Sequence, residues 1–68
     1  MKAQIEKTLS TVAGTLVEVT VRKANEFTFE FSGNSKNICD KIKNFFGRGS
    51  FEVEFDEELN TTFIYLTL

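Results

Sequence analysis

Three segments of this chain alternate apolar and polar residues with a period of two, the pattern of strands buried on one face. They are residues 16–22, 27–31 and 51–55. A fourth segment, residues 61–68, is apolar on both of its faces from Phe63 onward. A strand with two apolar faces is typical of the middle of a sheet, because a strand at the margin of the sheet is less covered. We therefore expect a four-stranded sheet in which the last strand is central.

Two further segments place apolar residues three and four positions apart, the spacing of one face of a helix. In residues 3–13 the stripe consists of Ile5, Leu9, Val12 and Ala13. In residues 35–46 it consists of Ile38, Cys39, Ile42, Phe45 and Phe46. A glycine follows each stripe as a helix stop, and Asn34 or Ser35 can cap the second helix. Several β-branched residues in the first segment leave a strand open as the alternative there.

The predicted elements follow one another in the order αββαββ. Stacking the second αββ unit on the first gives an α+β fold, a four-stranded antiparallel sheet with two helices packed on one face. This is a circular permutation of the ferredoxin-like arrangement, in which the second and fourth strands are central. The similar halves suggest an internal duplication, although any two amphipathic helices followed by hairpins resemble each other.

The length of 68 residues allows one α+β domain, residues 1–68. A core of this size is marginal alone, so a homodimer that shares part of its core is one expectation. A single cysteine excludes an internal disulfide and fits a reducing compartment. Charges near the N-terminus interrupt any signal-peptide core, and no apolar stretch is long enough to span a membrane. We therefore expect a cytoplasmic protein that makes no contact with a membrane.

The predicted sheet has two different faces. The side chains expected beneath the helices are Val17, Val19, Val21, Phe27, Phe29, Phe31, Phe51, Val53, Phe55, Ile64, Leu66 and Leu68. The opposite, open face then holds Glu18, Thr20, Arg22, Thr28, Glu30, Glu52, Glu54, Asp56, Phe63, Tyr65 and Thr67. Acidic side chains outnumber basic ones on this open face, whereas Lys36, Lys41, Lys43 and Arg48 make the helix side basic.

Few residues of the chain could carry catalysis. It has no histidine, the commonest general base and metal ligand. Cys39 lies on an apolar helix stripe, where a buried small hydrophobe is the better interpretation than a nucleophile. The carboxylates of Glu52 and Glu54 are best interpreted as a solvated face, and residues 56–58 lack the glycine of a calcium loop. We expect no enzymatic activity, no cofactor and no metal site.

Aromatic rings surrounded by charge have the composition of an interface centre with a polar rim. We therefore interpret the chain as a non-enzymatic protein-binding module that acts stoichiometrically as an inhibitor, adaptor or regulatory accessory protein. Its partner is expected to have a basic surface. The expected contacts are Phe63, Tyr65, Glu18, Glu30, Glu52, Glu54 and Asp56. Accessory proteins of phages and mobile elements are commonly of this size, which suggests such an origin.

Other uses of the two faces stay open. Two sheets could pack back to back in a homodimer, or Phe63 and Tyr65 could be strand-forming residues covered by their neighbours. Aromatic residues on a sheet of this type can also bind RNA, but the carboxylates around them would repel phosphates. The alternative function is therefore a small nucleic-acid-binding module that uses the basic helix side. Its phosphate contacts would be Lys36, Lys41, Lys43 and Arg48.

Overall fold

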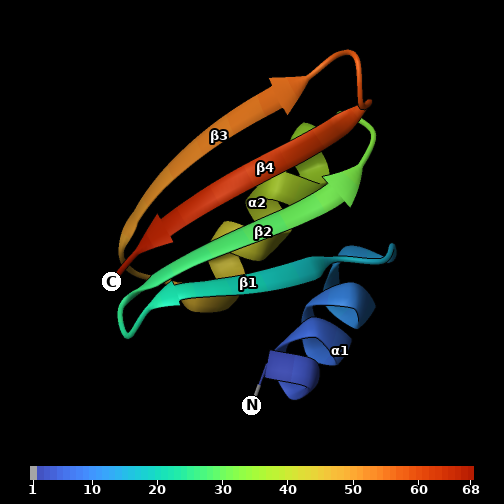
Figure 1. Ribbon diagram of the computed structural model, residues 1–68. Helices are drawn as coiled ribbons and strands as arrows, with labels where there is room; N and C mark the ends of the chain where they lie inside the picture. Colours follow the sequence, from blue (N-terminus) through green and yellow to red (C-terminus); the bar gives the residue numbers. More distant parts are fainter. Residues whose placement is uncertain (1) are drawn as a thin grey trace.

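The computed structural model describes residues 2–68 and shows an α+β fold (Figure 1). Its elements are α1 (Lys2–Ala13), β1 (Glu18–Lys23), β2 (Glu26–Ser32), α2 (Lys36–Phe46), β3 (Ser50–Asp56) and β4 (Thr61–Thr67). The predicted order αββαββ is confirmed. The first segment is a helix, so the alternative of a strand there was wrong.

The four strands form one sheet in the order β1-β2-β4-β3, and each strand is antiparallel to its neighbours. The prediction that β2 and β4 are central is confirmed, and this order is consistent with the permuted ferredoxin-like arrangement. In Figure 1, α2 lies behind β2 and β4, whereas α1 lies beside β1. The strand β3 is at the other margin of the sheet.

Both helices end in the same way. The N–H group of Gly14 donates to the carbonyl of Ser10 (2.9 Å), and that of Gly47 donates to the carbonyl of Lys43 (3.0 Å). Both glycines have a left-handed backbone, with φ of 76° and 69°, which residues with a Cβ rarely adopt. At the start of α2, the hydroxyl of Ser35 accepts a hydrogen bond from the N–H of Ile38 (3.3 Å).

The core lies between the sheet and the two helices. Its buried members are Leu9, Ala13, Val17, Val19, Phe29, Phe31, Cys39, Ile42, Ile64 and Leu66. The ring of Phe46 stacks on that of Phe29, with 5.2 Å between centroids, and also lies near Phe51. Two residues of the predicted helix stripes, Val12 and Phe45, are exposed instead of buried, because each lies at the flank of its stripe.

Three side chains predicted beneath the helices are about half exposed, namely Val21, Val53 and Leu68. Val53 lies opposite the buried Ile64 and therefore points to the helix side of the sheet. Its side chain is nevertheless 46% exposed, because β3 is at the sheet margin beyond the helices. Val21 lies near the end of β1, and Leu68 follows the last residue of β4.

Candidate functional site

The strand register fixes the centre of the open face. Phe63 of β4 lies between Glu30 of β2 and Glu54 of β3, directly opposite both. Tyr65 lies in the next row of this face, opposite Glu52 on its β3 side. Both rings are half-buried. They alternate along β4 with side chains that are buried beneath the helices, so they lie on the opposite side of the sheet from the core.

The row through Phe63 has a glutamate on each of the other three strands. Glu18 of β1 lies opposite Glu30, and Glu30 lies opposite Phe63, which in turn lies opposite Glu54. Among the side chains of residues 4–68 the structure shows a single ion pair, between Lys23 and Glu26 (3.4 Å), at the other end of these strands. Glu30 and Glu54 therefore flank the ring, and no described basic side chain forms an ion pair with these two carboxylates or with that of Glu18.

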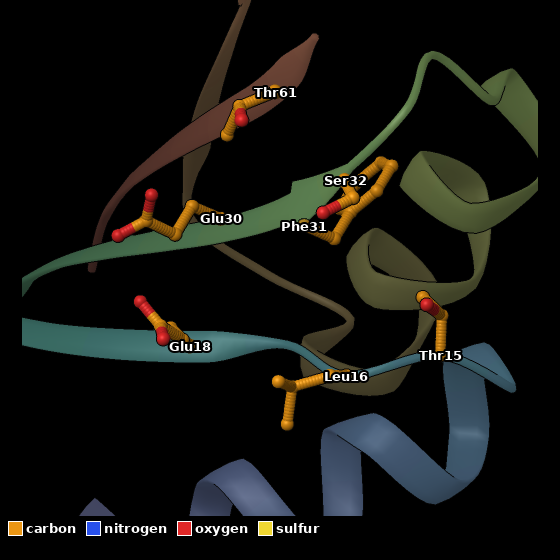
Figure 2. A pocket seen from close by; sticks show the side chains of 7 residues that line it. All are labelled: Thr15, Leu16, Glu18, Glu30, Phe31, Ser32 and Thr61. Atoms are coloured by element: carbon orange, nitrogen blue, oxygen red, sulfur yellow. The ribbon is translucent and has the colours of Figure 1, made fainter. Parts of the chain in front are cut away.

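Glu18 and Glu30 also line a pocket of about 170 Å³ at the end of β1 and β2 (Figure 2). The other residues of its wall are Thr15, Leu16, Phe31, Ser32 and Thr61. Leu16, at 72% exposure, supplies an apolar surface beside the two carboxylates. A pocket with paired negative charges and an apolar wall suits the aliphatic stem and cationic head of a lysine or arginine.

The environment of Glu30 differs from that of the other acidic residues on this face. Burial raises the pKa of the Glu30 carboxyl above its ordinary value. The negative charge of Glu18, together with a hydrogen bond to it, raises this pKa further. Like charges placed directly opposite each other destabilise a sheet, so a cation bound between the two carboxylates would relieve this cost.

The opposite end of the open face, around Tyr65, carries charges of both signs. A hollow of about 440 Å³ here is bordered by Tyr65, Arg22, Lys23 and Glu26, among others. The hydroxyl of Thr28, which lies opposite Tyr65, is buried without a hydrogen-bond partner in the described part of the chain. The Tyr65 end of this face therefore carries both basic and acidic side chains, whereas the Phe63 row carries acidic ones.

Asp56, also predicted as a contact residue, organises the turn between β3 and β4. Its Oδ1 atom accepts hydrogen bonds from the N–H groups of Glu58 (3.0 Å) and Leu59 (3.2 Å). This is the usual way in which an aspartate stabilises a turn. Glu52 and Glu54, in contrast, are exposed on β3, and no described hydrogen bond engages their carboxylates.

The four basic residues of the alternative site lie on α2 and directly after it. Lys36 and Lys41 are exposed on α2, Lys43 is half-buried in its last turn, and Arg48 is exposed just after it. Cys39 on the same helix is buried, and this burial raises the pKa of its thiol although Lys43 counteracts the shift. A raised pKa disfavours the reactive thiolate at neutral pH.

Two side chains of α1 that were not predicted as functional form hydrogen bonds with the outer edge of the sheet. The hydroxyl of Ser10 accepts a hydrogen bond from the N–H of Val17 (2.9 Å), just before β1. The carboxylate of Glu6 accepts one from the N–H of Val19 in β1 (2.9 Å). The sequence indicates this only through the spacing of Glu6 and Ser10, which are four residues apart and therefore lie on one side of the helix.

The remaining observations concern the chain as a whole. Within residues 2–68, neither helix has the length and apolar character needed to cross a membrane. No group of three or more metal-ligating side chains gathers in this part of the chain. No protein-family model, curated protein or solved structure matches the sequence or the fold.

Proposed function

We propose that this protein is a non-enzymatic binding module that docks a protein with a basic surface onto the open face of its sheet. It acts stoichiometrically, as an inhibitor, adaptor or regulatory accessory protein. The observation that carries the proposal is the row through Phe63, in which an aromatic ring on a central strand is flanked by Glu30 and Glu54. Such a ring anchors a partner, and the carboxylates speed the encounter with a basic surface and orient it.

The pocket at Glu18 and Glu30 supports the same kind of partner. A lysine or arginine that enters it meets two carboxylates that repel each other in the free protein. Binding then removes a repulsion as well as forming charge-assisted hydrogen bonds. The carboxylate that binds the partner's basic residue and the ring that makes the apolar contact are close together, because Glu30 and Phe63 are cross-strand neighbours.

A second copy of the chain fits this face less well. Two identical open faces packed with their Phe63 rows in contact would bring the glutamates of one row close to those of the other. Nucleic acid meets the same difficulty, because its phosphates would lie against the carboxylates. A basic protein surface is the partner that this charge pattern favours.

The test requires a captured partner and two sets of variants. The tagged protein is used to isolate a partner, which is then purified and titrated by calorimetry. We expect Phe63→Ala and Tyr65→Ala each to weaken binding by at least about 30-fold, which is the loss typical of interface anchors. The matched control, Lys41→Ala with Lys43→Ala on the helix side, should leave the affinity unchanged.

Loss of a half-buried ring can also disturb the fold, so a second variant keeps that ring. Glu30→Lys with Glu54→Lys reverses the charge on both sides of Phe63 and should abolish binding of the basic partner, while circular dichroism verifies the fold. The proposal fails if the variants at Phe63, Tyr65, Glu30 and Glu54 bind the partner normally and the variant Lys41→Ala with Lys43→Ala does not. Nucleic-acid binding through the helix side would instead appear as an affinity that falls steeply with salt and depends on Lys41 and Lys43.

A further inference from the structure

The two edge strands, β1 and β3, differ in whether another element binds their outward backbone groups. At the β1 edge, α1 supplies Ser10 and Glu6 as hydrogen-bond acceptors for the N–H groups of Val17 and Val19. Those backbone groups are therefore occupied, and the helix lies beside them (Figure 1). A strand from another protein could not pair there without displacing these side chains.

The β3 edge has no such cover. β3 pairs with β4 on one side only, so every second residue directs its N–H and C=O groups away from the sheet. In residues 2–68 no hydrogen bond joins these outward backbone groups to another element. Neither helix lies directly behind β3 in Figure 1, and β3 is therefore the edge at which another strand can be added.

The helix side of β3 also carries a partly exposed apolar strip, formed by Phe51, Val53 and Phe55. Val53 is 46% exposed, and the two phenylalanines are partly exposed. Phe51 lies near the ring of Phe46, which in turn contacts the exposed Phe45 edge to face. A strand added to β3 would place alternate side chains on this strip and bury it.

The other face of β3 determines the chemistry of the added strand. Glu52 and Glu54 are exposed there, two residues apart on the same side of the strand. In a neighbouring strand, directly opposite residues point to the same face, so two positions separated by one residue would lie opposite these carboxylates. The intervening residue would point to the apolar strip beside Val53.

We propose that β3 accepts an extended partner segment in which lysine or arginine alternates with apolar residues, and that this segment adds to the sheet as a fifth strand. This inference rests on the proposed function in that both require a basic partner. It names the edge that binds and the conformation of the bound segment. A second copy of β3 is disfavoured as the occupant, because the antiparallel self-pairings that keep the apolar sides together over most of the strand place Glu52 or Glu54 opposite another acidic residue.

The test uses a capped peptide as long as β3, with the sequence Thr-Val-Lys-Ile-Lys-Val-Thr, titrated into the isotope-labelled protein. We expect amide chemical shifts to change along β3, and hydrogen exchange of its outward amides to become slower. A peptide methylated on two successive backbone nitrogens, which blocks both of its edges, should not bind. A peptide with glutamate in place of both lysines should not bind either.

Variants of the protein test the charge argument separately. Glu52→Gln with Glu54→Gln should weaken binding of the lysine peptide by about three- to tenfold, the effect of losing two cross-strand ion pairs. Glu52→Lys with Glu54→Lys should reverse the preference, so that the glutamate peptide binds and the lysine peptide does not. The matched control, Glu57→Lys with Glu58→Lys, makes the same change of net charge in the adjacent turn and should leave the preference as it was.

Each alternative outcome overturns the edge proposal in its own way. Shift changes confined to Phe63, Tyr65 and their neighbours would show that the peptide uses the open face, in which case the proposed function stands and the edge proposal falls. Changes along β3 that appear with rising protein concentration and no peptide would identify a second copy as the occupant. Equal binding of the lysine and glutamate peptides, or binding of neither, would also refute the proposal.

Discussion

Replacement of Glu30 by glutamine should stabilise the protein at neutral pH. In the wild-type sheet the carboxylates of Glu18 and Glu30 lie directly opposite each other on neighbouring strands. Such like-charge pairs cost roughly 0.2–1 kcal/mol. For a chain of this length, about 0.5 kcal/mol corresponds to a rise of about 2–4 °C in Tm. Glutamine keeps the shape of the side chain, so the packing against Phe63 should be retained.

The pH dependence of this effect has a definite sign. The pKa of Glu30 is raised in the folded state, by burial first and by Glu18 second. Between the unfolded and folded pKa values the folded protein therefore binds more protons, and its stability falls as the pH rises through this window. The cost of the carboxylate is fully present above the folded pKa and is relieved as the pH falls through it. The advantage of Glu30→Gln should consequently be largest near pH 7 and vanish near pH 4.

Thermal unfolding followed by circular dichroism, at low salt and at several pH values between 4 and 7, measures this difference. Glu52→Gln is the matched control, because it makes the same charge change opposite the neutral Tyr65 and should give a smaller gain. High salt should reduce the gain from Glu30→Gln, since screening weakens the repulsion. An equal gain for both variants, or a gain at pH 4 as large as at pH 7, would refute the explanation by cross-strand repulsion.

Two further predictions concern buried groups. Thr62 is fully buried, and its hydroxyl donates to the carbonyl of Gly33 (2.6 Å). Thr62→Val should therefore lower the free energy of unfolding by about 1 kcal/mol. Urea titration measures this free energy, and an unchanged value would show that water replaces the hydroxyl. Cys39 should react slowly with a thiol reagent in the native state and rapidly after denaturation, because burial raises the pKa of its thiol. Equal rates in the two states would contradict the burial of this side chain.

The arrangement of the elements could be predicted because each depends on a local pattern. Alternation in β1, β2 and β3 identifies the strands, and the two apolar faces of β4 identify it as central. These patterns do not predict how far the helices extend over the sheet. Val53 has the sequence context of a core residue and is nevertheless half exposed, because exposure depends on whether a helix lies beneath that strand.

The pairing of Glu18 with Glu30 depends on the register, which alternation alone does not determine. Lys23 lies opposite Glu26 across a two-residue turn, and continuing that register would place Glu18 opposite Phe31. An acidic residue would then share a face with a core side chain. The irregularity between Val21 and Lys23 shifts the register by one residue and restores the match of the faces. The acidic pair of the candidate site is thus a consequence of this shift in register.

The open face and the β3 edge are adjacent, and Glu54 belongs to both. It is exposed on the edge strand, where an added strand would lie beside it, and it is also the cross-strand neighbour of Phe63. A partner segment on β3 would therefore bring its basic side chains to the margin of the Phe63 row. At the opposite margin, Ser10 and Glu6 occupy the N–H groups of Val17 and Val19. A partner that contacts both the open face and the β3 edge would therefore approach from the β3 side. The rest of that partner would then lie over the open face.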